Sequence, residues 1–127
     1  MDMMKPLILA VDDTTENLDI LVESLGQEYD MMVATDGEDA LIAIQEQRPD
    51  LILLDIMLPQ MYGWEVLEKI KSDVSTQHIP VVMLSARHYL EDEVETKVYA
   101  DLFSAYIVKP FVVRDLLDKI AGVLGPG

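Results

Sequence analysis

Polar side chains suited to phosphoryl-transfer chemistry follow short apolar runs at several separate points of the chain. They are Asp12 with its neighbour Asp13, then Asp55, Ser85 and Lys109. Carboxylates gathered at one place repel each other and need a compensating charge, which a hard divalent cation supplies. Mg²⁺ favours oxygen ligands and takes one or two carboxylates together with water and phosphate oxygens. A remaining aspartate could then act as a nucleophile toward phosphorus, while an amine and a hydroxyl hold the phosphoryl oxygens.

The elements that would position these groups are five apolar runs of four or five residues. They cover residues 7–11, 31–34, 51–54, 81–84 and 105–108. Continuous runs of this length are typical of strands buried on both faces of a parallel sheet.

Amphipathic stretches lie between and after these runs, and apolar residues recur in them at helical spacing. Asp36 is a plausible N-cap of the second helix, and Gly26 lies near the end of the first. The stretch over residues 90–100 is mostly polar, so we expect its helix to be exposed and mobile, with ill-defined ends. Alternating strands and helices predict an α/β fold, a doubly wound (βα)5 three-layer sandwich around a five-stranded parallel sheet.

In such a sheet the carboxyl ends of all the strands meet at one edge, which is where open α/β sheets bind ligands. A single aspartate at a strand end is more often a helix cap or a turn residue. The joint pattern is more specific, because it brings three carboxylates, one hydroxyl and one amine to the same edge. The sequence therefore predicts a phosphoryl and divalent-metal site there.

Composition narrows the classes of function. The chain has 127 residues, no cysteine and a net charge of −15. That charge argues against direct nucleic-acid binding by this domain, and the absence of cysteine removes disulfides and thiolate metal sites. The first apolar run ends at two aspartates and is too short for a signal peptide or a membrane span. We expect a cytoplasmic protein without membrane contact, with one domain over residues 1–127 and no output domain in this chain.

The stretches LILAVDD, DLILLDIMLPQMYGWE, IPVVMLSA and YIVKPF make the sequence resemble the receiver domain of two-component response regulators over nearly its whole length. The resemblance implies a flavodoxin-like fold with strand order 2-1-3-4-5. It also implies phosphoryl transfer from a histidine kinase or histidine phosphotransfer protein, which switches a protein-interaction surface. Such a domain is not a separate enzyme, since it catalyses only its own phosphorylation and dephosphorylation.

The resemblance assigns the acceptor-site roles residue by residue. Asp55 matches the phosphoacceptor, and Asp12 and Asp13 match the acidic pair that holds Mg²⁺ or Mn²⁺ together with Asp55. Met57 matches the residue whose backbone carbonyl joins the metal ligands. Lys109 matches the active-site lysine.

Three further positions match the family's switching features. Ser85 matches the switch hydroxyl, and Tyr106 matches the aromatic residue that turns inward when Ser85 engages the phosphoryl group. The bond before Pro110 matches one that is cis in the family. Met57 and Arg87 flank the entrance and neither is a catalytic base, so slow self-dephosphorylation is expected.

Two departures from the family pattern concern surfaces. Tyr62 stands before Gly63 where an acidic residue is usual, and residues 99–105 replace a short glycine-containing turn. We expect Leu102 and Phe103 in that segment to pack inward rather than contact a partner. The sequence does not identify the output partner. It also does not decide whether the chain forms a homodimer through the face of the fourth helix, fifth strand and fifth helix.

Three other functions compete with a phosphorylated switch. A flavodoxin-like cofactor binder should have a phosphate-cradling loop where Asp12 and Asp13 stand. An aspartyl-phosphate hydrolase commonly has an acid two residues after its nucleophile, and here that residue is Met57. The third alternative is a non-phosphorylated receiver-like interaction module.

Overall fold

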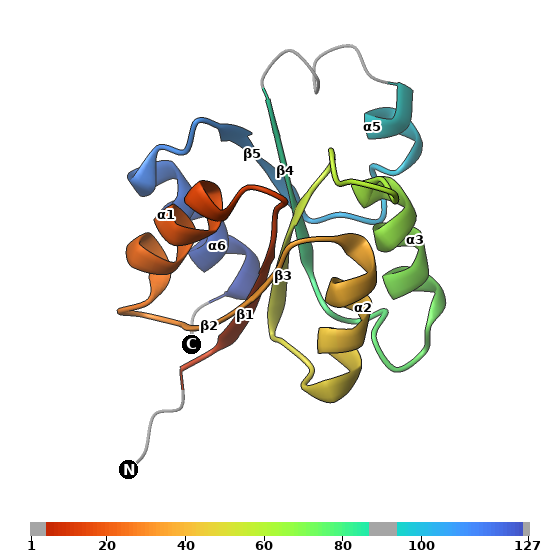
Figure 1. Ribbon diagram of the computed structural model, residues 1–127, viewed down its shortest axis with the longest axis horizontal. Coiled ribbons are helices and arrows are strands. Elements are labelled where there is room, and N and C mark those ends of the chain that lie inside the picture. The colour runs from red at the N-terminus through yellow and green to blue at the C-terminus, as the bar shows by residue number, and fades with distance from the viewer. Residues whose placement is uncertain (1–4, 87–93, 126–127) are drawn as a thin grey trace.

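The computed structural model describes residues 5–86 and 94–125 and contains a five-stranded parallel sheet (Figure 1). The strands are β1 (Leu7–Val11), β2 (Asp30–Ala34), β3 (Leu51–Asp55), β4 (Val81–Ala86) and β5 (Ala105–Lys109). Their order across the sheet is β2-β1-β3-β4-β5, as the resemblance implied. Strand order reverses between β1 and β3, and the candidate site lies at the carboxyl ends of those strands.

Helices cover both faces of the sheet. They are α1 (Thr15–Leu25), α2 (Gly37–Glu46), α3 (Gly63–Ser72), α5 (Val94–Val98) and α6 (Val113–Leu124). Figure 1 shows α1 and α6 together on one face, with α2, α3 and α5 on the other. The predicted three-layer α/β sandwich is confirmed.

The strands form two separate cores because alternate side chains point to opposite faces. Ile8 and Ala10 of β1 pack with the buried residues of α1 and α6, while Leu9 and Val11 pack with those of α2 and α3. All five residues of β3 are buried. The apolar runs of β1, β3 and β4 therefore do correspond to strands that are covered on both faces, whereas the edge strands β2 and β5 are only partly buried.

Local signals fix the helix ends that the sequence suggested. Asp36 is the N-cap of α2, and its Oδ1 accepts a hydrogen bond of 2.7 Å from the backbone N–H of Asp39. Gly26 is the C-cap of α1. Trp64 lies at the start of α3 and is buried.

The segment before β5 departs from the long helix that was expected there. Of the helix expected over residues 90–100, the structure describes only the five residues of α5, and residues 87–93 lie outside the described part. Leu102 and Phe103 pack against the core on the α3 side, so the expected inward packing is confirmed. This turn contains no residue with positive φ, which explains how it forms without a glycine.

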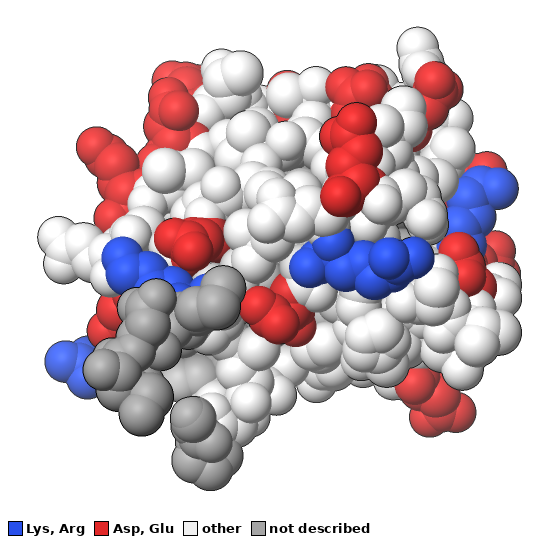
Figure 2. Space-filling model, turned by 90° about the horizontal axis from the view of Figure 1, so that it is seen from below, with Lys and Arg blue, Asp and Glu red and all other residues white. Residues whose placement is uncertain are grey.

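Acidic side chains are spread over the face of the molecule that is seen from below. Figure 2, which views the molecule from below, shows acidic side chains around much of this face and basic side chains in a few separate groups.

In the part of the chain that the structure describes, no helix has the length and apolar character needed to cross a membrane.

Candidate functional site

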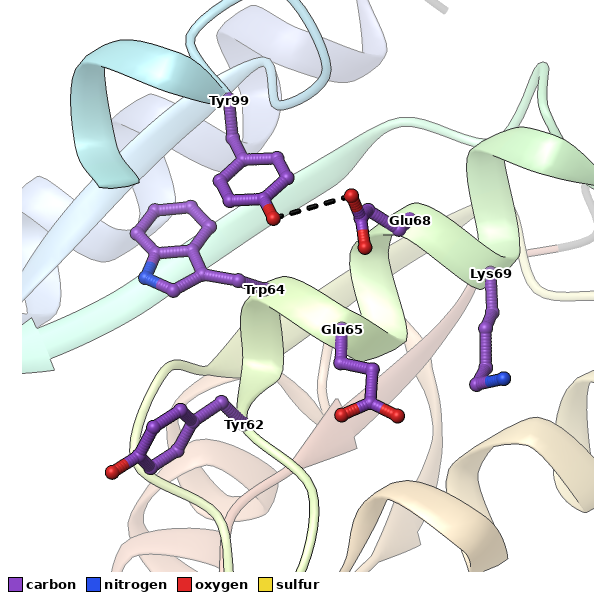
Figure 3. A pocket seen from close by; sticks show the side chains of 6 residues that line it. All are labelled: Tyr62, Trp64, Glu65, Glu68, Lys69 and Tyr99. Carbon is purple, nitrogen blue, oxygen red and sulfur yellow. Dashed lines mark hydrogen bonds between the residues drawn. The ribbon is translucent and has the colours of Figure 1, made fainter. Parts of the chain in front are cut away.

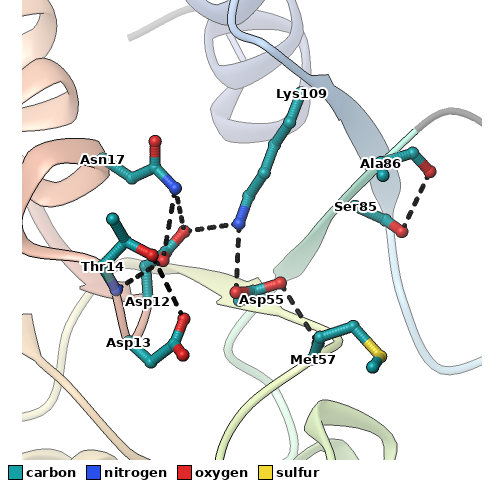
Figure 4. Close-up of polar contacts among 9 residues, drawn as sticks. All are labelled: Asp12, Asp13, Thr14, Asn17, Asp55, Met57, Ser85, Ala86 and Lys109. Atoms are coloured by element: carbon teal, nitrogen blue, oxygen red, sulfur yellow. Dashed lines mark hydrogen bonds and ion pairs between the residues drawn. The ribbon is translucent and has the colours of Figure 1, made fainter.

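The candidate site is built at the carboxyl edge of the sheet. Asp55 ends β3, Lys109 ends β5, and Asp12 follows β1 directly. Ser85 lies in β4, which pairs with both β3 and β5. Four strands therefore bring these polar groups to one place, as the sequence predicted (Figure 4).

Lys109 bridges the two buried carboxylates of the site. Its Nζ lies 2.7 Å from Asp12 Oδ2 and 3.0 Å from Asp55 Oδ2. Asp12 and Asp55 are 0% and 3% exposed, whereas Asp13 is exposed at the rim. Carboxylate oxygens of Asp12, Asp13 and Asp55 all lie within 4.8 Å of one another, so this donor set fits a hard divalent cation.

Backbone and side-chain donors orient the acidic groups. Asp12 Oδ1 accepts a hydrogen bond of 2.9 Å from the Thr14 N–H, and Asn17 Nδ2 lies 3.4 Å from both Asp12 oxygens. Asp55 Oδ1 accepts one of 3.2 Å from the Met57 N–H. The contact from Asn17 was missed in the sequence, where the only signal is a polar residue in the first turn after Asp12 and Asp13.

Burial and neighbouring charges act differently on the pKa of Asp55 and on that of Lys109. Burial raises the pKa of Asp55 to about 6; Lys109 opposes this rise and the negative Asp12 adds to it. Burial alone would lower the pKa of Lys109, but its contacts with Asp12 and Asp55 outweigh burial and raise it. Lys109 therefore stays cationic at neutral pH, while Asp55 is costly to ionise until a further cation arrives.

This raised pKa predicts a pH dependence of stability without divalent metal. The native state retains the Asp55 proton up to about pH 6, whereas the unfolded state releases it near 3.8. The Asp55 contribution to the free energy of unfolding is therefore highest at low pH and is lost as pH rises through 6. The free energy of unfolding of Asp55→Asn should therefore rise relative to that of the native chain by about 2 to 3 kcal/mol as the pH increases from 4 to 7. Denaturant unfolding in a chelator measures this, and a constant difference across that range would contradict it.

Ser85 and Tyr106 lie on β4 and β5, and neither side chain forms a hydrogen bond with Asp55. The Ser85 hydroxyl is buried and donates to the Ala86 carbonyl at 3.2 Å. Tyr106 lies on edge strand β5 and is 43% exposed. Lys119 Nζ donates to the Tyr106 carbonyl at 2.9 Å and lies 5.3 Å from its ring centroid, a contact that the sequence did not suggest.

The loop after Asp55 passes very close to the strand that carries it. A Cβ on Gly63 would lie 2.2 Å from the Asp55 carbonyl oxygen, so only glycine fits there. The Gly63 N–H donates to the Ile56 carbonyl at 2.8 Å. The Lys109–Pro110 peptide bond is cis. Arg87, expected at the entrance, lies outside the described residues.

Comparison with known proteins agrees with the fold and the acidic site. The family model of the response regulator receiver domain matches residues 8–121. This chain belongs to the response regulator receiver domain family and so to two-component signalling. Its acidic pocket is consistent with the phosphoacceptor site of that family.

Individual relatives support the assignment. The chain is 38% identical over 122 residues to the DNA-binding response regulator MtrA of Mycobacterium bovis, covering 94% of this chain and 51% of the relative. It is 30% identical over 120 residues to hybrid signal transduction histidine kinase D of Dictyostelium discoideum, covering 94% of this chain and 8% of that protein. The chain thus spans about half or less of the length of these curated relatives.

Solved structures give the same result. The N-terminal domain of a response regulator receiver protein from Methanoculleus marisnigri is 39% identical, with a TM-score of 0.77 and coverage of 96% of this chain and 98% of that one. The chemotaxis response regulator CheY4 of Vibrio cholerae is 29% identical, with a TM-score of 0.85 and coverage of 95% and 99%.

Proposed function

We propose that Asp55 accepts a phosphoryl group from a phosphohistidine of a histidine kinase or histidine phosphotransfer protein. One observation carries the proposal. The buried Asp55 carboxylate lies 3.0 Å from Lys109 Nζ, inside a cluster with Asp12 and Asp13. Phosphoryl transfer depends mainly on positioning and charge neutralisation, and this arrangement supplies both.

In the proposed step an Asp55 oxygen forms a bond to phosphorus while the phosphorus–nitrogen bond of the donor breaks. The electron pair of that bond stays on the donor imidazole. Lys109, held between Asp12 and Asp55, contacts a phosphoryl oxygen and offsets its negative charge. The Ser85 hydroxyl turns from the Ala86 carbonyl to donate to another phosphoryl oxygen.

Asp12, Asp13, Asp55 and the Met57 backbone carbonyl would hold Mg²⁺ or Mn²⁺. The bound cation would neutralise charge on the carboxylates and on the transferring phosphoryl group. Asp12 is already oriented for this by Thr14 and Asn17. Asp13 is exposed at the rim, where ligand exchange with solvent is easy.

Phosphorylation would act on partners through Ser85 and Tyr106. When Ser85 turns toward the phosphoryl group it leaves space for Tyr106 to move inward, which shifts an existing equilibrium toward the active shape. The changed surface lies on α5, β5 and α6. We infer that an output partner or a second copy of the chain reads this surface, in the cytoplasm.

The direct test is labelling of the purified chain by a small phosphodonor such as acetyl phosphate. One phosphoryl group per chain should be gained with Mg²⁺ and none in chelator. Without a cation, the clustered carboxylates repel the negatively charged phosphodonor. Borohydride reduction of the acyl phosphate followed by peptide mapping locates the group. A label on another residue, or labelling that is independent of metal, would refute the proposal.

A further inference from the structure

Aromatic residues from two separate parts of the chain meet beside α3. The Trp64 and Tyr99 rings are stacked, with centroids 5.2 Å apart and planes 9° apart. Phe103 packs on Trp64 at 5.8 Å with a tilt of 47°. Tyr62 lies at the start of the same helix, and its side chain is 57% exposed. The two departures from the family pattern, at residue 62 and over residues 99–105, thus converge on one surface.

This surface contains a pocket of about 480 Å³ (Figure 3). Its walls are Tyr62, Trp64, Glu65, Glu68, Lys69 and Tyr99. Figure 3 shows the two glutamates and Lys69 along α3, with the aromatic rings toward the start of that helix.

The carboxylates of this pocket form no ion pair within the described residues, although Lys69 also lines the pocket. No lysine or arginine of residues 5–86 or 94–125 lies within 4 Å of the Glu65 or Glu68 carboxylate. The Tyr99 hydroxyl donates to Glu68 Oε2 at 3.2 Å, which leaves Oε1 able to accept from a ligand. Two exposed carboxylates beside an exposed tyrosine ring form a surface suited to an organic cation.

The pocket also contains a hydrogen-bond donor without an acceptor. Trp64 is 3% exposed, and among the described residues its Nε1 has no hydrogen-bond partner. Figure 3 shows this nitrogen on the indole edge that turns toward Tyr62 and away from Glu68. Buried donors in native proteins are nearly always satisfied, so an acceptor is expected from outside these residues.

We propose that this pocket, here called the α3 pocket, binds a basic segment of a partner polypeptide. An arginine or lysine side chain lies against Tyr62 and between the carboxylates of Glu65 and Glu68. A backbone carbonyl of the same segment accepts from Trp64 Nε1 after a local side-chain rearrangement uncovers this buried donor. A net charge of −15 favours a basic partner and disfavours a polyanion. This binding does not use the phosphoryl group and goes beyond the function proposed above.

The test uses the unphosphorylated full chain and two peptides, acetyl-Ala-Arg-Ala-Arg-Ala-amide and its citrulline analogue. Trp64 is the single tryptophan of the chain, so its fluorescence reports on the α3 pocket directly. The arginine peptide should give a saturable change in emission, and the neutral citrulline peptide should give none at the same concentrations.

Matched variants separate a specific site from general attraction to an acidic protein. Glu65→Gln/Glu68→Gln should weaken peptide affinity roughly tenfold, because two charge-assisted contacts are lost. Glu28→Gln/Glu46→Gln removes the same charge from exposed positions elsewhere and should change affinity by less than about twofold, because screening limits distant effects. Tyr62→Ala should also weaken binding; the side chain is exposed and makes no helix-capping hydrogen bond, so folding should persist.

Several results would overturn the proposal. Equal weakening by both double variants would show general electrostatic attraction. A fluorescence change with protein concentration alone would assign the surface to a second copy of the chain. Equally tight binding of free arginine amide would indicate a small-molecule site. If millimolar peptide produced no saturable change in fluorescence, the α3 pocket would not be a site for basic peptides.

Discussion

Replacing Asp55 by asparagine is expected to reduce phosphoryl labelling to background while the fold is retained. An amide cannot form the acyl phosphate that a carboxylate forms. The substitution keeps the side-chain shape, and the asparagine oxygen can still accept from the Met57 N–H. Because it also removes a carboxylate that is costly to ionise, the variant should not be less stable at neutral pH. Labelling with acetyl phosphate and Mg²⁺, with the intact mass as readout, measures the effect.

The matched control for this substitution is Asp30→Asn. Asp30 is an exposed aspartate at the start of β2, at the opposite end of the sheet from the site. This variant should be labelled at the native rate and to the native extent. Labelling of Asp55→Asn at the native level would refute the acceptor assignment, and so would loss of labelling in Asp30→Asn.

The second large effect is expected from Gly63→Ala. The added methyl group would lie 2.2 Å from the Asp55 carbonyl oxygen and 2.9 Å from Ile56 Cα, and backbone atoms cannot move aside as a flexible side chain would. Overpacking of this kind should lower the free energy of unfolding by about 3 kcal/mol. It should also slow labelling of the folded fraction, because the end of β3 that carries Asp55 must shift. Denaturant unfolding and labelling at low temperature measure the two effects.

Gly122→Ala is the control for this change. Gly122 lies inside α6, and a Cβ there would meet nothing within 4 Å. Alanine is the better helix former, so this variant should be more stable than the native chain by up to about 1 kcal/mol. Similar destabilisation by both alanines would show that the close approach at Gly63 is not the cause.

The sheet and the gathering of the acidic site were predictable because they depend on short-range pattern. Continuous apolar runs identified the strands, although only the central β1, β3 and β4 are covered on both faces, and parallel strands necessarily share a carboxyl edge. Asp12, Asp55 and Lys109 each stand at the end of such a run, so their proximity follows from topology. Their individual roles stay predictions that the labelling experiments address.

Other features were not predictable because they depend on side-chain packing between distant segments. Nothing in the sequence indicates that Asn17 reaches Asp12, or that Lys119 lies over Tyr106. The stacking of Trp64 on Tyr99 joins residues 35 positions apart and depends on how the turn after α5 packs on α3. The mostly polar residues 90–100 gave only a weak helical pattern, and only Val94–Val98 of that stretch is described as helix.

Burial across the sheet has a consequence for its motions. Strand β3 is buried along its whole length, whereas edge strand β5 is largely half-exposed and includes Tyr106 at 43% exposure. Backbone amides in wholly covered strands exchange with solvent mainly through global unfolding, and those at an exposed edge also exchange through local opening. We therefore expect slower amide exchange in β3, which carries Asp55, than in β5, which carries Tyr106. Asp55 and Tyr106 thus lie on strands of opposite kind, one a covered central strand and the other a partly exposed edge strand.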